Sequence, residues 1–458
     1  MTNLPEAYVT QMKRLLGEAG FFAYEKALEQ SVTRALRVNL LLCPDGVPPC
    51  GIEGLGERVP WAKGAYFVEG DARPGLSPLH EGGLYYLQEP SALSSVSALD
   101  PRPGERVLDL CAAPGGKSTQ IAALMGGEGL LVCNEPVPSR AQILSRNIER
   151  MGVQNAVVTC AMPDQLAPRF EAYFDRIMVD APCSGEGMFR RQAEAREEWS
   201  ENAPRGCADR AMEILEEAVK MLRPGGVMVY STCTFNDTEN EGVLARFLAI
   251  HPECEMKPFM LPGLPSGEKG YIHLYPHEIR GEGHFVSLIK KSENAPAAKE
   301  APAREKTKKG GGKPPRGRDG AKKVETKIEL PDVLARGVEF KRLHIAGDSL
   351  WALPEGLDDI GRFDGLRVLR TGLLLAHLEG RRSEPDHALA MALRPSQAAR
   401  TAELTHEQAL AYQAGEALDL GDLPQGYTLL THEGVSLGFG KQAGGLMKNH
   451  YPKGLRRR

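Results

Sequence analysis

Short apolar runs alternate with longer amphipathic stretches between about residue 100 and residue 290. Each run ends in small or polar residues where a helix should begin, which is typical of βαβ units and predicts an α/β fold. Ligands of such sheets bind beyond the carboxyl ends of the strands, so candidate chemistry is expected just after the runs. The predicted strands are RVLDL, GLLVC, AVVTC, RIMVD and VMVYST, with YIHLYP and HFVSLIK as a closing hairpin or antiparallel edge.

The two ends of the chain show weaker patterns. Residues 1 to about 90 open with apolar positions at helical spacing, namely Tyr8, Met12, Leu15 and Leu16, and continue through a Gly- and Pro-rich region without a catalytic signature. Beyond residue 328, glycines break the short strand-like runs LHIAG, SLWALP and LRVLRTGLLLAHL, and a helical stretch is predicted near 396–413.

Length and composition place the chain among ordinary soluble globular proteins. Its 458 residues exceed the size at which one core keeps growing, so more than one domain is expected. No basic segment followed by an apolar run opens the chain, and no run of about 18 apolar residues occurs, so we expect a cytoplasmic protein without a membrane partner. The nine cysteines form no CxxC pair, which favours free thiols over disulfides or a metal site.

Charge is distributed unevenly along the chain. The net charge of -4 excludes a uniformly basic nucleic-acid binder, but residues 290–327 hold 13 Lys or Arg against 5 Asp or Glu, a net charge of +8. This stretch is rich in Lys, Pro, Gly and Ala and cannot bury enough apolar surface to order itself. It is either a solvated linker between domains or an arm that neutralises nucleic-acid phosphates.

A loop of small residues follows the first predicted strand. Small residues let the backbone approach a ligand closely, and a helix beginning near Lys117 offers free N–H groups and the positive end of its dipole to a carboxylate. The spacing matches neither a phosphate-binding P-loop nor GxGxxG, and a simple tight turn is the alternative. The loop residues are Cys111, Ala112, Ala113, Pro114, Gly115, Gly116 and Lys117.

The second predicted strand ends in Asn134-Glu135-Pro136. An acidic residue about 20 positions after the glycine loop is where nucleotide-binding sheets hold a ribose diol. Glu135 is therefore the candidate ribose ligand, with an ordinary surface carboxylate as the alternative. Arg140 opens the following helix and either lines the same pocket or lies on the helix surface.

Two cysteines follow neighbouring predicted strands, in Asp180-Ala-Pro-Cys183 and Tyr230-Ser-Thr-Cys233. A single buried cysteine is usually a small hydrophobic residue. Two cysteines at the carboxyl ends of adjacent strands should meet at one rim of the sheet, beside the proposed ligand site.

The motifs DLCAAPGGKS, NEP, DAPCSGEGMFRR and YSTCTF, in this order and spacing, resemble the RNA cytosine-5 methyltransferase family, specifically its RsmF-like ribosomal branch. The resemblance covers residues from about 105 to 240, with weaker echoes in GLYYLQEPSA and LYPHEIRGEGHF. The tail GLMKNHYPKGLR is similar to the PUA-like RNA-binding ending of that branch.

This resemblance implies a Rossmann-like methyltransferase fold with S-adenosyl-L-methionine over the loop Cys111–Lys117 and its ribose held by Glu135. It further implies that Cys233 is the nucleophile, that Cys183 helps to expel the enzyme from the methylated product, and that Asp180 contacts the cytosine ring or the cofactor edge. The family's adenine-contacting acidic residue has no clear match in VVTCAMPDQL, where Asp164 is the nearest candidate.

The expected chemistry explains the need for a thiol. Carbon 5 of cytosine is a poor nucleophile, and a thiolate that adds to carbon 6 makes an enamine-like intermediate able to take a methyl group. Because a free thiol has a pKa of about 8.5, Cys233 needs activation by dipoles or by a cation that the sequence does not identify.

Rival functions lack their signatures. A DNA cytosine methyltransferase would carry an ENV-type glutamate, a nucleobase deaminase would pair HxE with PCxxC, and an adenine or amino methyltransferase would show Asn/Asp-Pro-Pro before an aromatic residue. A ribosome-assembly factor that binds RNA without turnover, and a transfer-RNA methyltransferase, remain as alternatives. The expected partner is ribosomal RNA, free or within the small ribosomal subunit, bound by a monomer.

Together the patterns and the resemblance predict five segments. They are an N-terminal RNA-binding or helical domain over 1–90, the Rossmann-like methyltransferase domain over 91–290, a basic flexible linker over 291–327, a C-terminal intermediate domain over 328–390 and a PUA-like RNA-binding domain over 391–458.

Overall fold

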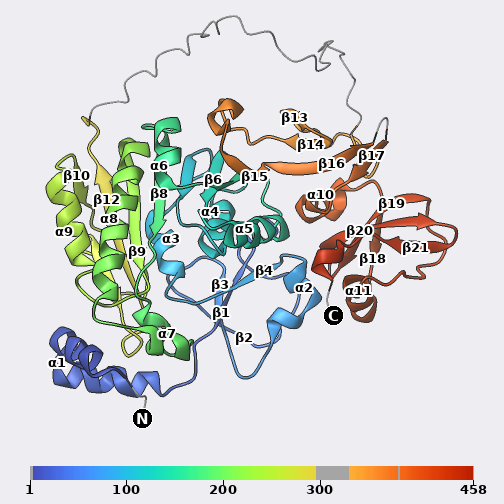
Figure 1. Cartoon of the computed structure of the whole chain (residues 1–458). Coiled ribbons are helices and arrows are strands. Elements are labelled where there is room, and N and C mark those ends of the chain that lie inside the picture. Colours follow the sequence, from blue (N-terminus) through green and yellow to red (C-terminus); the bar gives the residue numbers. More distant parts are fainter. Residues whose placement is uncertain (1–3, 296–329, 380–381, 457–458) are drawn as a thin grey trace, which may run out of the picture.

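The computed structural model describes residues 4–295, 330–379 and 382–456, so most of the predicted basic linker lies outside the described residues. A mixed sheet of nine strands dominates the described chain, and three smaller four-stranded sheets are built from residues before and after it (Figure 1).

Five parallel strands form the centre of the main sheet, and each coincides with a predicted apolar run. The chain enters at β5, moves outward through β6 and β7, and then crosses back to β8 and β9 on the other side of β5. This reversal makes the carboxyl ends of β5 and β8 the switch point at which such sheets bind ligands. The prediction of an α/β fold is confirmed. The strands are β5 (Arg106–Asp109), β6 (Leu130–Asn134), β7 (Ala156–Cys160), β8 (Phe174–Asp180) and β9 (Leu222–Thr232).

Helices cover both faces of the sheet because successive strand residues point to opposite sides. Leu108 belongs to one buried apolar cluster with Leu215, whereas its neighbour Val107 belongs to a second cluster with Ile121 and Leu144. The helices of this region are α3 (Leu93–Leu99), α4 (Gly116–Leu124), α5 (Pro138–Arg150), α6 (Pro163–Leu166), α7 (Ala193–Glu198), α8 (Ala203–Met221) and α9 (Glu241–Ile250).

Antiparallel strands close both edges of the main sheet. On one side β12 (His284–Lys291) pairs with β9 and carries β10 (Cys254–Met256) and β11 (Tyr271–Leu274), so the predicted antiparallel edge is confirmed. On the other side β15 (Arg367–Thr371) pairs with β7. The sequence places this run in a separate intermediate domain, but it instead satisfies the edge of β7, which would otherwise expose unpaired backbone groups.

The N-terminal region combines a long helix with a small antiparallel sheet of order β2-β3-β1-β4. The sheet was not predicted, since four-residue strands are too short for a clear alternation. Helix α1 lies across the end of the molecule, next to α7 (Figure 1). The elements are α1 (Glu6–Leu28), β1 (Ala35–Val38), β2 (Leu55–Arg58), β3 (Ala65–Val68), α2 (Pro78–Glu81) and β4 (Tyr85–Gln88).

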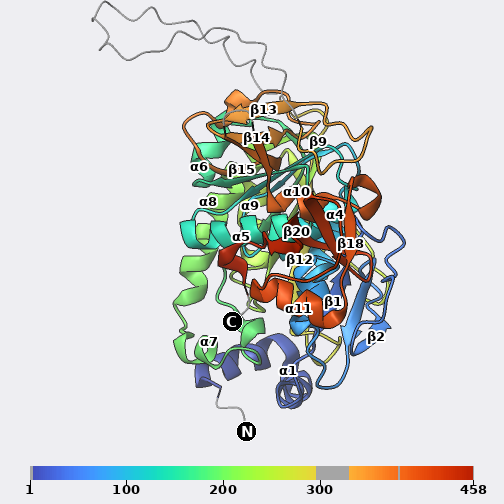
Figure 2. The same cartoon turned by 90° about the vertical axis from the view of Figure 1, so that its right-hand side faces the viewer.

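The C-terminal region forms two four-stranded sheets that pack against α5 and the N-terminal region (Figure 2). The helix predicted near 396–413 begins later, at His406, because Thr405 caps it through a hydrogen bond to the backbone N–H of Gln408. The elements are β13 (Leu343–Ala346), β14 (Ser349–Ala352), β16 (Leu373–Glu379), β17 (Arg382–Pro385), α10 (His387–Ala392), β18 (Thr401–Glu403), α11 (His406–Ala414), β19 (Gly426–His432), β20 (Val435–Ala443) and β21 (Leu446–Asn449).

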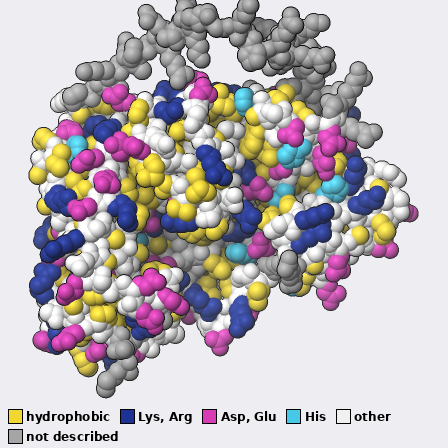
Figure 3. All heavy atoms as spheres, in the orientation of Figure 1, with side chains coloured by type: hydrophobic (Ala, Val, Ile, Leu, Met, Phe, Trp, Pro, Cys, Tyr) yellow, Lys and Arg dark blue, Asp and Glu magenta, His cyan; other side chains and the backbone are white. Residues whose placement is uncertain are grey.

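The surface carries charges of both signs. Lys and Arg side chains are interspersed with Asp and Glu over the face drawn in Figure 3. Among the described helices none combines the length and the apolar character needed to cross a membrane. The described residues also contain no cluster of three or more His, Cys, Asp or Glu side chains that could hold a metal ion.

Candidate active site

A cavity of about 860 Å³ opens at the carboxyl ends of the parallel strands. The loops after β5, β6, β8 and β9 line it together with α6 and α8. Of the residues predicted from the sequence, Ala112, Pro114, Gly115, Gly116 and Lys117 do not line this cavity. Those that do are Cys111, Ala113, Glu135, Arg140, Asp164, Asp180, Cys183 and Cys233.

The loop between β5 and α4 brings its backbone to the cavity as expected. Gly115 has a φ of 113°, a conformation that favours glycine, and it turns the chain into α4 at Gly116. Ala112 is buried, and its N–H donates to the carbonyl of Asn134 at the end of β6. The loop is therefore fixed to the neighbouring strand, with its small side chains leaving space above it.

The N-terminal sheet supports this loop from below, which the sequence did not predict. The buried guanidinium of Arg37 on β1 donates to the carbonyls of Gly116 and Thr119 and, at 2.8 Å, to the hydroxyl of Thr119. Burial lowers the pKa of Arg37 to about 10. Arg37 therefore ties the first turn of α4 to the N-terminal region.

Glu135 lies at the end of β6, where the ribose ligand was expected. Its side chain is only 3% exposed, yet it lines the cavity. One carboxylate oxygen accepts the N–H of Val137 at 3.0 Å, and the other lies 3.5 Å from Arg140. Arg140 also donates a hydrogen bond to the carbonyl of Ala113, so it bridges the loop after β5 and the loop after β6.

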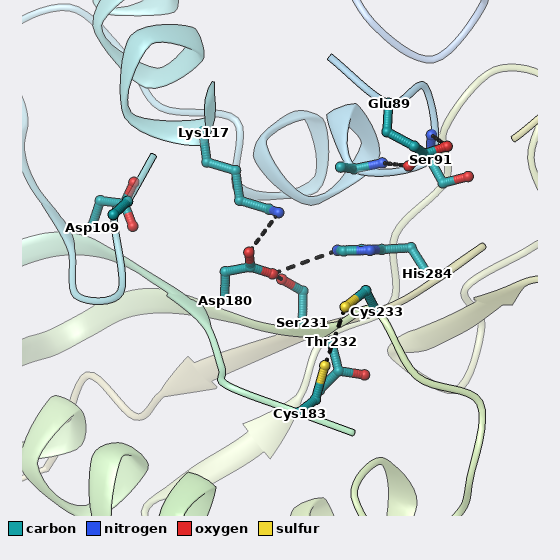
Figure 4. A network of polar contacts seen from close by, with 12 residues as sticks. Glu89, Ser91, Asp109, Lys117, Asp180, Cys183, Ser231, Thr232, Cys233 and His284 are labelled. Atoms are coloured by element: carbon teal, nitrogen blue, oxygen red, sulfur yellow. Dashed lines mark hydrogen bonds and ion pairs between the residues drawn. The ribbon is translucent and has the colours of Figure 1, made fainter. Parts of the chain in front are cut away.

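Asp180, at the end of β8, is held from three sides (Figure 4). One oxygen lies 2.7 Å from Nζ of Lys117, and the other accepts from the Ser231 hydroxyl at 2.8 Å and lies 3.6 Å from Nε2 of His284. Burial alone would raise the pKa of Asp180, but Lys117 and His284 outweigh that effect and hold this pKa well below its usual range. Asp180 therefore presents a charged acceptor to the cavity.

Lys117 is a largely buried cation between the Asp180 carboxylate and Cys233. Burial lowers the pKa of Lys117, but the Asp180 carboxylate, with smaller contributions from Cys233 and Asp109, raises it above the ordinary value. The side chain therefore stays protonated in a position where its charge acts on both Asp180 and the Cys233 sulfur. Lys117, in the first turn of α4, therefore connects the loop after β5 to Asp180 at the end of β8.

The two predicted cysteines meet. Sγ of Cys183 lies 3.3 Å from Sγ of Cys233, within hydrogen-bond distance for sulfur (Figure 4). The hydrogen bond with Cys233 and burial together raise the pKa of Cys183 well above its ordinary value. The Cys183 thiol therefore keeps its proton at neutral pH.

Several polar residues of the site escaped the sequence analysis. His284 is the first residue of β12. The next residue, Phe285, pairs with Thr232 at the end of β9, so His284 lies beside Cys233. Asp109 ends β5 and accepts from the Ser118 hydroxyl at 2.6 Å, while burial raises the pKa of Asp109 to about 7. Neither position carries a sequence signal by itself, although Asp109 opens the first motif.

Comparisons with known proteins agree with this geometry. Residues 96–290 match the family model described as 16S rRNA methyltransferase RsmB/F. Residues 4–90 match the N-terminal domain of 16S rRNA methyltransferase RsmF, residues 327–393 the RsmF rRNA methyltransferase first C-terminal domain, and residues 399–457 the methyltransferase RsmF PUA domain.

Curated relatives extend over nearly the whole chain. The chain is 32% identical to ribosomal RNA small subunit methyltransferase F of Erwinia tasmaniensis over 98% of this chain and 96% of that protein. It is 33% identical to the protein of the same name from Klebsiella pneumoniae, with the same coverage of both chains.

Solved structures share the fold of the central region. A methyltransferase homolog protein from Pyrococcus horikoshii superposes with a TM-score of 0.56 and 30% identity over 63% of this chain and 96% of that chain. NSun6 from Pyrococcus horikoshii with SFG superposes with a TM-score of 0.53 at 22% identity, covering 63% of this chain and 99% of that chain, and shows the fold alone. The Rossmann-like methyltransferase fold is thereby confirmed.

Proposed function

Because this chain belongs to the RsmB/F family of 16S rRNA methyltransferases, we propose that it methylates carbon 5 of a cytosine in small-subunit ribosomal RNA, with Cys233 as covalent nucleophile. As a member of this family, the protein is an S-adenosyl-L-methionine-dependent RNA methyltransferase. The observation that carries the finer proposal is the pair of thiols, with sulfurs 3.3 Å apart, at the rim of the ligand cavity.

The cavity fits the cofactor. Its volume of about 860 Å³ is within the range of small-molecule sites, roughly 300–1,000 Å³. The nearly buried carboxylate of Glu135 can accept hydrogen bonds from the ribose hydroxyls, and Asp164 and Met162, which also line the cavity, are the candidate contacts of the adenine ring. When bound, S-adenosyl-L-methionine supplies an electrophilic methyl group.

Cys233, Asp180 and Cys183 have different roles in the proposed reaction with cytosine. The Cys233 thiolate, stabilised by Lys117, forms a bond from its sulfur to carbon 6, and the displaced π electrons make carbon 5 nucleophilic. The Asp180 carboxylate accepts a hydrogen bond from the amino group of the base. After carbon 5 has taken the methyl group, its proton passes to solvent, the electrons of the C5–H bond re-form the C5–C6 double bond, and the S–C6 bond breaks. Cys183 is positioned to donate its proton to the departing Cys233 sulfur and is then reprotonated from solvent.

The remaining proposals concern partners and place of action. We infer a cytoplasmic monomer in which the regions over 1–90 and 391–458 bind RNA beside the methyltransferase domain over 91–290, with an intermediate domain over 328–390. Shortening the basic segment over 291–327 is expected to weaken rRNA binding and flatten its salt dependence. An unchanged salt slope would show that the segment is only a tether.

The test is denaturing electrophoresis of Cys183→Ala and Cys233→Ala after incubation with S-adenosyl-L-methionine and unmodified 16S rRNA, free or in the small subunit. Adduct with Cys183→Ala and none with Cys233→Ala is expected. The reverse pattern would exchange the two roles. Cofactor binding without adduct or 5-methylcytosine, even with the wild-type enzyme, would favour a transfer-RNA substrate or a non-catalytic assembly factor.

A further inference from the structure

Two buried carboxylates link the loops that carry the cysteines, and neither belongs to the chemistry described above. Glu186 lies three residues after Cys183, and Glu239 lies six residues after Cys233. Both side chains are almost completely buried. Within the described parts of the chain, neither forms an ion pair with a Lys, Arg or His side chain, so a role in balancing charge does not explain them.

Glu186 reaches from the Cys183 loop to the Cys233 loop. One of its oxygens accepts the backbone N–H groups of Phe235 and Asn236, at 2.8 and 3.0 Å. These groups follow Cys233 by two and three residues, so Glu186 fixes the backbone that directs the Cys233 sulfur. The loops also meet through the N–H of Gly187, which donates to the carbonyl of Cys233 at 2.8 Å.

Glu239 makes the reciprocal contact from the Cys233 loop. It accepts the backbone N–H of Ser184 at 2.8 Å, together with the Ser184 hydroxyl. Ser184 directly follows Cys183. Each loop therefore holds the backbone beside the cysteine of the other, and Asn236 donates to both carboxylates at their meeting point.

Helix α1 completes the arrangement from outside the methyltransferase region. The second oxygen of Glu186 accepts from Nε2 of Gln11 at 2.9 Å and from Nε1 of Trp199 at 3.3 Å. On the same helix, Arg14 pairs with Asp237 through two hydrogen bonds at the surface. Gln11 thus touches the buried carboxylate, whereas Arg14 touches the same loop without contacting Glu186.

We propose that Glu186 is a positioning residue that sets the separation of the Cys183 and Cys233 sulfurs, and that α1 holds it through Gln11. Its functional meaning rests on the proposed roles of the two cysteines. Among the residues that the structure describes, five donors and no acceptor hydrogen-bond to the Glu186 carboxylate, so only a carboxylate satisfies them all. An amide in its place leaves donors unpaired in either orientation and loosens one loop or the other.

The first test measures the sulfur separation without cofactor or RNA. Full-length wild type, Glu186→Gln, Gln11→Ala and the control Arg14→Ala are treated with diamide, and the Cys183–Cys233 disulfide is quantified by peptide mass spectrometry. A 1 Å displacement costs about 100-fold in a geometry-sensitive reaction, so we expect cross-linking to slow at least tenfold in Glu186→Gln and less in Gln11→Ala. Arg14→Ala should match wild type.

The second test asks whether the separation matters for release of the product. With S-adenosyl-L-methionine and 16S rRNA, Glu186→Gln is expected to turn over more slowly while covalent adduct accumulates, because the Cys183 proton no longer reaches the departing sulfur. General destabilisation would instead lower adduct and turnover together.

Unchanged cross-linking rates in both Glu186→Gln and Gln11→Ala would overturn the proposal, as would a wild-type protein that forms no cross-link. If Glu186→Gln does not fold, Gln11→Ala decides alone. A wild-type enzyme that cross-links but makes no 5-methylcytosine would contradict the proposed function and leave the positioning role intact.

Discussion

The candidate active site has two halves that are built differently, a cysteine half at the ends of β8 and β9 and a cofactor half at the ends of β5 and β6. At the ends of β8 and β9, side chains are crowded and bonded to one another, with Glu186 and Glu239 joining the two cysteine loops. At the ends of β5 and β6, the cavity is open, and it is lined by Leu110, Cys111 and Ala113 after β5 and by Glu135, Pro136, Val137 and Arg140 after β6. The same sheet supports both halves, which share Lys117 at their boundary.

This difference follows from what each half must do. Covalent attack and release depend on distances between protein atoms, which a rigid network of buried hydrogen bonds maintains. Cofactor binding depends on space and on accessible backbone, which side-chain networks would fill. Variants in the cysteine half should therefore alter rates strongly, and variants in the cofactor half should alter affinity.

The largest effect is expected for Lys117→Met, which removes the charge shared by the two halves. Removing one preorganised group that stabilises charge in an active site costs about 100- to 1,000-fold in rate, so methyl transfer should fall by roughly that factor. Alkylation of Cys233 by iodoacetamide should slow as well, since the thiolate loses its cation. Lys63→Met, at an exposed lysine of the N-terminal region, is the control. An unchanged alkylation rate would remove Lys117 from the activation of Cys233.

A second prediction concerns Asp109, the buried last residue of β5. Because its folded-state pKa of about 7 lies above the ordinary value of 3.8, its contribution to stability is complete below pH 3.8 and is lost as the pH rises to about 7. The loss is on the order of 4 kcal/mol at 1.36 kcal/mol per pKa unit. Asp109→Asn mimics the neutral form and should gain stability relative to wild type over this range, as measured by thermal unfolding from pH 5 to pH 8. A difference in stability between Asp109→Asn and wild type that does not change with pH would contradict the raised pKa of Asp109.

Glu135→Gln should lower the affinity for S-adenosyl-L-methionine without changing the geometry of the two cysteines. Hydrogen bonds to a charged acceptor contribute about 1.5–3 kcal/mol, so the dissociation constant for S-adenosyl-L-methionine should rise roughly 10- to 100-fold in calorimetric titration. The rate of Cys183–Cys233 cross-linking by diamide should stay at the wild-type value. A slower cross-link would show that the two halves are not independent.

The smallest effect is expected for Arg140→Ala. This side chain is 52% exposed and its contact with Glu135 is long, at 3.5 Å. Exposed ion pairs contribute about 0–1 kcal/mol, so cofactor affinity should fall by no more than about fivefold. A larger loss would show that Arg140 contacts the cofactor itself.

The predictable part of the fold was the part with a strong pattern. The runs RVLDL, GLLVC, AVVTC, RIMVD and VMVYST are buried on both faces and became β5 to β9, and the antiparallel edge followed from HFVSLIK. The four-residue strands β1 to β4 were not predicted, because such short segments show no clear alternation of apolar and polar residues. Strand β15 lies in the predicted strand-like run LRVLRTGLLLAHL, but its pairing with β7 was not predicted, since it joins segments about 200 residues apart.

The motifs determined which chemical groups gather at the edge. The loop Cys111–Lys117, Glu135, Asp180, Cys183 and Cys233 each follow a strand, and parallel strands bring their carboxyl ends together, so the sequence alone predicted one site.

Only the tertiary structure decided how these groups are held. Lys117 meets Asp180, Arg37 supports the loop of α4, and Glu186 meets both Gln11 and the backbone after Cys233 because distant segments fold against one another. Spacing along a chain fixes which residues share a strand end or a helix face, since those follow from local periodicity. Contacts between such elements depend on how their side chains pack in three dimensions, and no local pattern records that.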